Sequence, residues 1–350
     1  MGVGAEPVRW GVLSTARIND AVLRGARKSE RLEVLAVASR DRERAEVYAR
    51  EHGIPRPHGG YEALLEDRDV EAVYISLPNS LHVQWSIRAL EAGKHVLCEK
   101  PLDRRPEEVE RAFDAAEEAD RFLMEAFMWR HHPQTSRLKQ LVDEGAIGEL
   151  RLVRSEFSFQ LTRLEDVRMR PELQGGSVLD LGCYWVSAAR LLAGEPEVVY
   201  GEQVLSATGV DVRFAATMRF PSDVLAHFDC AFDLPQRGVL EAVGSEGSLV
   251  ASDPYILGDH RGLLLLRGGE VEQVAVDHTN KYQLELENLS DAIRGRARPL
   301  LGRDDALGQA RALDALLRSA ESRTPVRIEH ETEQARAAKD PGTRSVQGGQ

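Results

Sequence analysis

The fold is decided by the stretch Val8-Arg-Trp-Gly-Val-Leu13, followed directly by Ser14-Thr-Ala-Arg-Ile-Asn19. The first six residues form a short, mainly apolar run, which predicts a buried strand. Apolar side chains then recur at four-residue spacing from Ile18 onward, which predicts a helix over residues 14–27 with one apolar face. A strand that runs directly into a helix is the first unit of a doubly wound α/β sheet.

Strands and helices continue to alternate as far as residue 128. The predicted strands are short apolar or β-branched runs bounded by turn residues, at residues 32–38, 70–77, 95–98 and 122–128. The predicted helices between them end near glycine or begin at proline, and cover residues 41–51, 81–92 and 106–119. This spacing predicts a parallel sheet with helices on both faces. We therefore expect residues 1–128 to form a Rossmann dinucleotide-binding domain.

The second half of the chain has a different pattern. Alternating or β-branched segments with few intervening helices predict strands at residues 150–161, 213–220, 224–232, 239–243 and 263–266. Helices are expected beside them at residues 133–144, 182–192, 282–294 and 304–322. Residues 129–330 should form an α+β domain with a large, mostly antiparallel open sheet, which binds substrate and mediates oligomerisation. Residues 331–350 are polar, and we expect a mobile tail there.

Composition narrows the classes of protein. The 350 residues include 57 acidic and 45 basic side chains, for a net charge of −12, which argues against nucleic acid as a partner. No apolar run reaches the ~18 residues of a membrane-spanning helix, and the first residues lack the basic region of a signal peptide. Cys98, Cys183 and Cys230 are widely separated, as is typical of reduced thiols. We expect a cytoplasmic protein without membrane or nucleic-acid partners.

The turn after the first strand is the expected place for a pyrophosphate, where a Rossmann unit usually has G-x-G-x-x-G or A. Small residues replace the leading glycines, and Asn19 replaces the third. Small side chains and the free N–H groups of a helix N-terminus still allow phosphate to approach. An ordinary tight turn explains the same residues equally well. The candidate cofactor contacts are Ser14, Thr15, Ala16, Arg17 and Ile18.

The end of the second predicted strand bears on the choice of cofactor. Folds that select NAD usually have Asp or Glu there to bind the ribose 2′-hydroxyl. This chain has Ser39-Arg40, and a hydroxyl with a guanidinium suits a 2′-phosphate. We therefore predict NADP (NADPH), with NAD still possible. The alternative is that Arg40 is a solvated surface charge.

Three further segments are more specific: Ser76-Leu-Pro-Asn-Ser-Leu-His82, Gly93-Lys-His-Val-Leu-Cys-Glu-Lys-Pro101 and Gly175-Gly-Ser-Val-Leu-Asp-Leu-Gly-Cys-Tyr184. With the segments RWGVLSTARI and MEAFMWRHHP, they resemble the Gfo/Idh/MocA oxidoreductase family. The resemblance is greatest to its dimeric dihydrodiol dehydrogenase and NADP-dependent D-xylose dehydrogenase branch. The Glu-Lys-Pro triplet is the most specific of these features, and the resemblance extends from Val8 to Ile328.

The resemblance implies roles for particular residues. Lys100 and Tyr184 match the catalytic lysine and tyrosine of the branch, and Asp180 matches its motif aspartate. A cis peptide bond is implied between Lys100 and Pro101. The resemblance implies that Asn79, His82 and Glu99 line the nicotinamide-ribose side of the cofactor. The other candidate cofactor contacts are Leu77, Pro78, Lys100 and Arg168, and Arg168, just before the Gly175-Gly176 turn, could bind substrate instead. The chain departs from the family in its glycine-poor turn and in Trp185, where close relatives often have proline.

The chemistry of alcohol oxidation fits these residue types. A phenol with a pKa of about 10 is a poor base at neutral pH, and a nearby ammonium should lower that pKa. Tyr184 would then act as base in oxidation and as acid in reduction, with Lys100 beside it. Asp180 lies four residues before Tyr184, so a helical turn would place both on one face. The alternatives are a surface lysine, an aspartate that caps the helix and a packed tyrosine.

Trp129 and His131 are candidate substrate contacts together with Asp180. His131 and His132 are adjacent, so their side chains should diverge, and no Cys, His or carboxylate cluster has the spacing of a metal site. We predict no metal.

These features predict an NADP-dependent dehydrogenase acting on a sugar, polyol or cyclic diol, assembled as a homodimer or homotetramer through the C-terminal sheet. The reverse reductase reaction, a non-catalytic nucleotide-binding sensor and a glycosidase using transient oxidation by bound cofactor remain alternatives.

Overall fold

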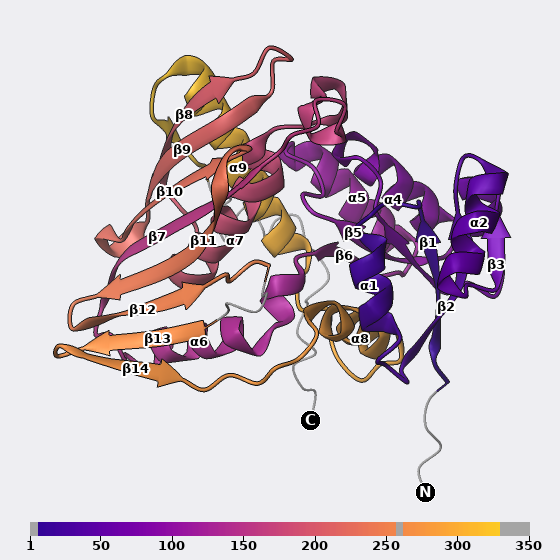
Figure 1. Ribbon diagram of the computed structural model, residues 1–350, viewed down its shortest axis with the longest axis horizontal. Coiled ribbons are helices and arrows are strands. Elements are labelled where there is room, and N and C mark those ends of the chain that lie inside the picture. Colours follow the sequence, from indigo (N-terminus) through magenta and orange to yellow (C-terminus); the bar gives the residue numbers. More distant parts are fainter. Residues whose placement is uncertain (1–5, 257–261, 330–350) are drawn as a thin grey trace, which may run out of the picture.

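The computed structural model describes residues 6–256 and 262–329 (Figure 1). The predicted tail at residues 331–350 lies outside the described residues. Two sheets with their helices make up the molecule, one in each half of the chain. No described helix is both long enough and apolar enough to cross a membrane.

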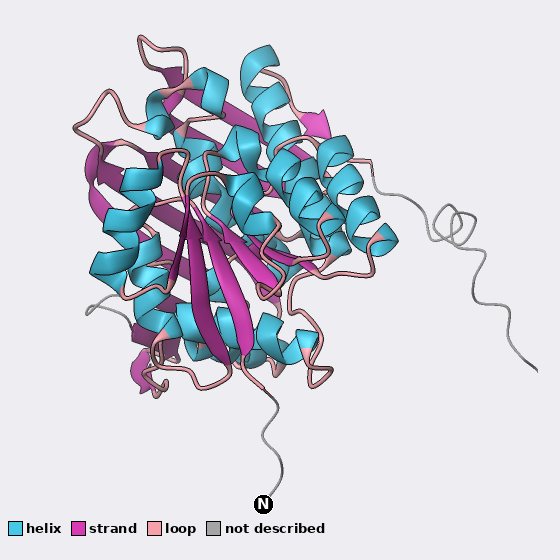
Figure 2. Cartoon of the chain, turned by 90° about the vertical axis from the view of Figure 1, so that its right-hand side faces the viewer, coloured by secondary structure: helices cyan, strands magenta, loops and turns pink. Residues whose placement is uncertain are grey.

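The first sheet is parallel and has six strands in the order β3-β2-β1-β4-β5-β6. Its strands are β1 (Val8–Leu13), β2 (Leu32–Ala38), β3 (Arg56–His58), β4 (Ala72–Ile75), β5 (His95–Glu99) and β6 (Leu123–Ala126). The helices between them are α1 (Asn19–Ala26), α2 (Arg42–His52), α3 (Tyr61–Leu65), α4 (His82–Glu91) and α5 (Pro106–Glu118). Figure 2 shows helices on both sides of these strands. The predicted Rossmann architecture is confirmed, and β3 and α3 are additions to the prediction.

The ends of the helices follow from local residues. In α2, Asp41 accepts a hydrogen bond from the backbone N–H of Arg44 at 3.2 Å, and Gly53 ends the helix with φ of 69°. α1 begins at Asn19 instead of residue 14, because Ser14 has a φ of 136°, far from helical values. The residues between Ser14 and Asn19 form a turn, in which the N–H of Asn19 donates to the carbonyl of Ala16 at 3.1 Å.

The second sheet has nine strands in the order β14-β13-β12-β11-β7-β10-β9-β8-β15, and only the β7–β10 pair is parallel. Its strands are β7 (Leu150–Gln160), β8 (Val198–Leu205), β9 (Asp211–Arg219), β10 (Leu225–Ala231), β11 (Asp233–Gly244), β12 (Gly247–Ser252), β13 (Gly262–Arg267), β14 (Glu270–Val274) and β15 (Val326–Arg327). The helices α6 (Pro133–Asp143), α7 (Cys183–Ala193) and α9 (Arg303–Ser322) pack against the face of this sheet that is turned toward the first sheet (Figure 1). The predicted large, mostly antiparallel sheet is confirmed.

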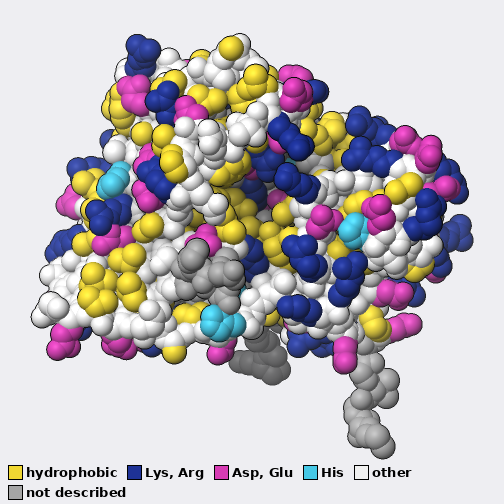
Figure 3. Space-filling view, viewed as in Figure 1, with side chains coloured by type: hydrophobic (Ala, Val, Ile, Leu, Met, Phe, Trp, Pro, Cys, Tyr) yellow, Lys and Arg dark blue, Asp and Glu magenta, His cyan; other side chains and the backbone are white. Residues whose placement is uncertain are grey.

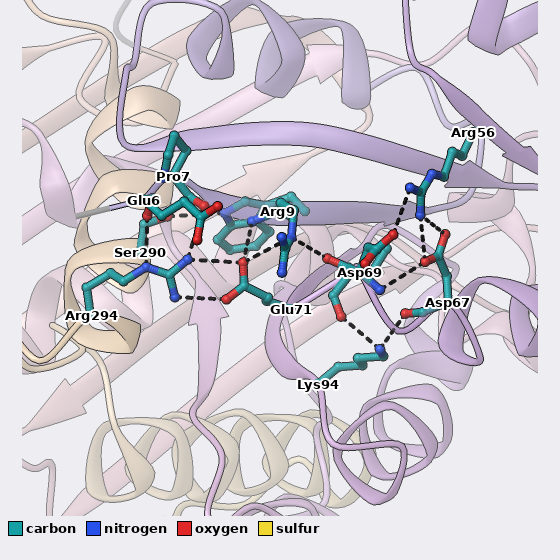
Figure 4. A network of polar contacts seen from close by, with 12 residues as sticks. Glu6, Pro7, Arg9, Arg56, Asp67, Asp69, Glu71, Lys94, Ser290 and Arg294 are labelled. Carbon is teal, nitrogen blue, oxygen red and sulfur yellow. Dashed lines mark hydrogen bonds and ion pairs between the residues drawn. The ribbon is translucent and has the colours of Figure 1, made fainter. Parts of the chain in front are cut away.

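Helix α8 (Lys281–Ile293) follows the second sheet in sequence but packs against α1 and the first sheet. Ser290 accepts a hydrogen bond from the indole N–H of Trp10 at 3.1 Å. Just beyond the helix, Arg294 forms two hydrogen bonds with the carboxylate of Glu71, at 2.9 and 3.0 Å (Figure 4). Glu71 also accepts from the backbone N–H of Arg9 at 3.1 Å. The chain thus returns to its first strand after completing the second sheet.

Candidate active site

The first sheet reverses its strand order between β1 and β4, which is where open α/β sheets bind ligands. Ser14 follows β1 and Ser76 follows β4, and their hydroxyl oxygens lie 2.7 Å apart. Ser76 donates to Asn19 Oδ1 at 2.6 Å, and the Asn19 amide donates back to the carbonyl of Ser14 at 2.9 Å. All three residues are buried. Side-chain hydrogen bonds therefore hold this turn, although Ser14 has a backbone conformation that favours glycine.

The rest of the predicted phosphate turn lies at the surface. Arg17 is exposed, and Thr15, Ala16 and Ile18 are half-buried. The N–H of Ala16 already donates to Ser14 Oγ at 3.1 Å, so this donor is used within the turn. A hollow of about 620 Å³ between α1 and α2 begins at Thr15 and Ala16, and its lining includes Arg17, Arg24, Arg27 and Arg44. Asp20 and Glu51 also line the hollow, so the turn opens onto a groove in which arginines outnumber carboxylates.

The end of β2 meets the same region. Arg40 is exposed, whereas Ser39 is buried and its hydroxyl accepts from the N–H of Asp41 at 3.3 Å. Arg44 donates to the carbonyl of Thr15 at 3.4 Å and so connects α2 to the phosphate turn. The sequence interpretation missed Arg44, although a basic residue in the first turn after Ser39-Arg40 was a usable signal. The guanidinium groups of Arg40 and Arg44 favour a 2′-phosphate over a 2′-hydroxyl. Asp41, the nearest carboxylate in sequence, already accepts a hydrogen bond as the cap of α2.

Lys100 lies at the carboxyl end of β5, and the Lys100–Pro101 peptide bond is cis, as predicted. Its ammonium donates to the carboxylate of Asp180 at 3.0 Å and to the backbone carbonyl of Asp180 at 2.8 Å. Asp180 belongs to a single π-helical turn, Val178–Gly182, directly before α7. The other carboxylate oxygen of Asp180 accepts from Arg168 Nε at 2.6 Å. The structure therefore brings three predicted residues into one ionic array.

The electrostatics of this array keep it ionised. Burial alone would raise the pKa of Asp180, but Lys100 and Arg168 hold it well below its usual range. Burial alone would lower the pKa of Lys100, and the charge of Asp180 outweighs that effect and raises it. At neutral pH the site thus contains an ammonium, a carboxylate and a guanidinium in contact.

Tyr184 stands in the first turn of α7 and is buried. Its ring is surrounded by Phe127, Phe157 and Tyr255, with centroids at 5.7, 5.7 and 5.4 Å. The Lys100 ammonium lies 4.8 Å from the ring centroid, over the face of the ring, and the phenol O–H donates to the sulfur of Met128 at 3.5 Å.

The expectation that Lys100 lowers the pKa of Tyr184 is wrong. Burial, and then the charge of Glu99, raises the pKa of the phenol well above its ordinary value of 10.0. The Lys100 ammonium lies over the face of the ring, 4.8 Å from its centroid, and donates twice to Asp180. Tyr184 is consequently a neutral phenol at physiological pH in this structure.

The remaining residues of the Leu77–His82 segment are engaged within the protein. His82 is fully buried, and its two ring nitrogens lie 2.8 Å from the carbonyls of Leu77 and Pro101. Pro78 begins a short 3-10 turn, and the side chain of Asn79 donates to the carbonyl of Gln174 at 2.9 Å. His82 therefore joins the turns after β4 and β5 and directs no free ring nitrogen into the site.

Glu99 also has partners inside the protein. It accepts from the phenol of Tyr74 at 2.6 Å and from the backbone N–H of Lys100 at 3.3 Å. Burial raises the pKa of this carboxyl, and Lys100 partly offsets the effect. Both carboxylate oxygens of Glu99 thus have a hydrogen-bond partner inside the protein.

The predicted substrate contacts are less accessible than expected. Trp129 is buried and packs edge-on against Tyr255, with ring centroids 5.5 Å apart. Burial lowers the pKa of His131 to about 3, and its Nε2 has no hydrogen-bond partner among the described residues. Among residues 6–256 and 262–329, no group of three or more His, Cys, Asp or Glu is arranged to hold a metal ion.

Figure 3 shows the molecule hollowed between the two sheets, with Lys and Arg side chains along the side of the hollow nearer the first sheet.

Comparisons with known proteins agree with this geometry. Residues 8–127 match the oxidoreductase family with an NAD-binding Rossmann fold, and residues 135–250 match the GFO/IDH/MocA C-terminal domain. The chain is 38% identical over 327 residues to D-xylose 1-dehydrogenase (NADP(+)) 2 of Haloferax volcanii, covering 91% of this chain and 99% of the relative. It is 33% identical over 248 residues to trans-1,2-dihydrobenzene-1,2-diol dehydrogenase of Danio rerio, covering 69% and 73%.

A solved structure is similarly close. KijD10, a 3-ketoreductase from Actinomadura kijaniata in complex with NADP and TDP-benzene, superposes with a TM-score of 0.85 at 32% identity, covering 89% of this chain and 98% of that one. Membership of one family accounts for both matched domains and for their order along the chain. It also accounts for the motifs that contain Lys100, Asp180 and Tyr184. The chain belongs to the Gfo/Idh/MocA oxidoreductase family.

Proposed function

We propose that this oxidoreductase uses NADP to transfer a hydride between the nicotinamide and a CH–OH group of a sugar, polyol or cyclic diol. The observation that carries the proposal is the ionic array of Lys100, Asp180 and Arg168, with Tyr184 beside it, at the carboxyl end of a parallel sheet. Hydroxylated substrates suit a site with ammonium, guanidinium and phenol donors. The relatives named for D-xylose and for dihydrodiols support this substrate class.

The cofactor's phosphates would be held by the basic groove at the phosphate turn. Arg17 and Arg44 line this groove together with Thr15, and Arg40 is exposed at the end of β2. When bound, the nicotinamide accepts or donates the hydride. The Ser14–Ser76–Asn19 hydrogen bonds fix the turn in place before the ligand arrives.

Lys100 and Tyr184 would handle the proton. Two of the three N–H groups of the Lys100 ammonium are donated to Asp180, which leaves one for a substrate oxygen. A phenol held neutral by burial is ready to donate a proton to the oxygen that becomes a hydroxyl during reduction. In oxidation the same phenol must first lose its proton, so Tyr184 would serve as base mainly at high pH.

The outer face of the second sheet is the surface through which we expect copies of the chain to associate. None of the described helices covers that face, and the sheet spans nine strands (Figure 1). We propose that two or four copies associate through it. The three cysteines are buried and free, consistent with the proposed cytoplasmic location.

Steady-state kinetics with NADP⁺ test the proposal. Formation of NADPH would be followed by its absorbance with D-xylose, other pentoses and hexoses, myo-inositol and trans-dihydrodiols as substrates. Each assay would be repeated with NAD⁺. We expect turnover with at least one of these classes and a preference for NADP⁺. Tight NADPH binding without turnover of any would contradict the enzymatic proposal and favour a sensor. Product without net redox change would favour transient oxidation.

The ketoreductase relatives suggest a second class of substrate. The chain is 36% identical over 299 residues to dTDP-3,4-didehydro-2,6-dideoxy-alpha-D-glucose 3-reductase of Streptomyces violaceoruber. Oxidation of NADPH by a keto sugar, measured with and without a nucleotide moiety, separates this candidate from free-sugar oxidation. A strict requirement for the nucleotide would make a nucleotide-linked keto sugar, and not a free sugar, the proposed substrate.

A further inference from the structure

Asp211 is a buried carboxylate that the reaction does not use directly. It is the first residue of β9 and lies against the turn at residues 175–178, which leads into the π-helical turn of Asp180. One of its oxygens, Oδ2, accepts from the hydroxyl of Ser177 at 2.6 Å and from the backbone N–H of Val178 at 2.8 Å. Both bonds therefore converge on a single oxygen at the start of the π-helical turn.

The other oxygen of Asp211 limits the turn sterically. Gly176 has a φ of 122°, and a Cβ there would lie 2.1 Å from Asp211 Oδ1. On the opposite side, a Cβ at Gly175 would lie 2.3 Å from the carbonyl oxygen of Arg168, and that carbonyl accepts from the N–H of Gly176 at 2.9 Å. The turn is thus clamped between Asp211 and the backbone of Arg168, and only glycine fits on each side.

This clamp has a direct route to the reacting groups. Lys100 binds the backbone carbonyl of Asp180 as well as its carboxylate, so the position of the backbone matters and not only the rotamer. The backbone N–H of Asp180 in turn donates to the carbonyl of Gly176 at 3.1 Å. A shift of the glycine turn would therefore move both acceptors of Lys100 together. π-helical turns are rare and recur at functional sites.

We propose that Asp211 is a positioning residue that holds the glycine turn so that the carboxylate Oδ1 and the backbone carbonyl oxygen of Asp180 both face Lys100. The position of Asp180 can be tested without cofactor or substrate, whereas its effect on turnover rests on the proposed function. Removal of the carboxylate frees the N–H of Val178 and the hydroxyl of Ser177 inside the protein, and the turn relaxes to satisfy them. Lys100 then loses part of its negative partner and its pKa falls.

The chain offers a readout that needs neither substrate nor cofactor. Its six lysines can be acylated with an amine reagent and counted separately by peptide mass spectrometry. Only the neutral amine reacts, so a pKa lowered by one unit raises the reactivity of Lys100 about tenfold at a fixed pH below its pKa. Lys94 is the internal control, because it is also buried but donates to the carbonyls of Asp67 and Val70 in the first domain.

We would compare three variants with the wild type at one pH. Asp211→Ala removes both bonds, and Lys100 labelling should rise about tenfold while Lys94 labelling stays unchanged. Asp211→Asn keeps an oxygen that can accept both bonds, and its labelling should remain close to wild type. Ser177→Ala removes one bond and adds no volume, so it should give a smaller rise and it serves if Asp211→Ala does not fold.

Several results would overturn the proposal. One is a folded Asp211→Ala with wild-type labelling of Lys100, and another is an equal rise at Lys94, which would indicate general loosening. Equal labelling in the Asp211→Asn and Asp211→Ala variants would also contradict it. Once a substrate is known, Asp211→Ala should lower kcat and leave the KM for the cofactor unchanged. A protein that proves inactive in every assay leaves the labelling test fully informative.

Discussion

Lys100 binds Asp180 twice, through the carboxylate at 3.0 Å and through the backbone carbonyl at 2.8 Å. The two residues come from different domains, one at the end of β5 and the other before α7. A third group, Arg168, holds the second carboxylate oxygen at 2.6 Å. The contact therefore fixes the ammonium relative to both sheets and sets the direction of its remaining N–H.

Replacing Lys100 by Met removes the charge and keeps most of the side-chain volume. We expect kcat to fall about 10²- to 10⁴-fold, as for the loss of a group that handles a proton. NADPH binding, measured by fluorescence titration, should remain close to wild type because the arginine groove is untouched. A Met variant with normal turnover would remove Lys100 from the mechanism.

Tyr184→Phe deletes only the hydroxyl. The ring contacts with Phe127, Phe157 and Tyr255 remain, so thermal unfolding should change little. We expect kcat to drop about 10²- to 10⁴-fold. A large loss of stability together with full activity per folded molecule would show a packing role only.

The raised pKa of Tyr184 predicts a pH profile. Oxidation needs the phenolate, so kcat/KM for oxidation should rise steadily up to pH 10.0, the ordinary pKa of the phenol, and beyond it. Reduction uses the protonated phenol and should already be at full rate at neutral pH. The two directions would be measured across one buffer series. An oxidation plateau that begins near pH 7 would mean that the bound ligands lower this pKa.

The array also predicts how stability responds to acid. The pKa of Asp180 is held below its unfolded value, so its contribution is present above about pH 4 and is lost as the pH falls through the folded value. Asp180→Asn should be less stable than wild type by up to about 3 kcal/mol, because Lys100 is left buried without its partner. Urea unfolding from pH 8 downward should show this difference constant to about pH 5 and shrinking below about pH 4. A difference that already shrinks near pH 6 would contradict the assignment.

Arg44 and Arg40 should discriminate between the two nicotinamide cofactors. Arg44→Ala is expected to weaken NADPH by about 1.5–3 kcal/mol, the range for a hydrogen bond to a charged group, and to leave NADH nearly unchanged. Arg50→Ala is a matched control, since Arg50 is exposed on the same helix but does not line the groove. Equal losses for the two variants would indicate a general charge effect instead of a phosphate contact.

The fold was predictable from sequence wherever a buried element has a strong local pattern. The bounds of β1 and β2 match the predicted runs, and α5 begins at Pro106 as expected. β3 and α3 were not predicted, because their three and five residues are too few for a periodic hydrophobic pattern. α8 was predicted as a helix, but its packing against α1 depends on tertiary contacts that no local pattern encodes.

The sequence predicted which residues form the candidate site better than it predicted how those residues are arranged. The motifs identified Lys100, Asp180 and Tyr184, yet the sequence could not show that the ammonium donates to Asp180 while it lies over the face of the Tyr184 ring. The replacement of glycine by Ser14 and Asn19 looked like erosion because their partner, Ser76, lies 57 residues beyond Asn19. His82 was placed beside the cofactor, but burial and two backbone carbonyls occupy its ring.

The return of α8 to the first strand has a consequence for the order of synthesis. Trp10 and Glu71 find partners at Ser290 and Arg294, which are added to the chain only near the end of translation. The strands of the first sheet can pair while the second sheet is still being made, but these two side chains cannot reach their partners until residues 290–294 have been added. We therefore expect a separately expressed N-terminal half to lack the contacts of Trp10 and Glu71 with α8 and Arg294.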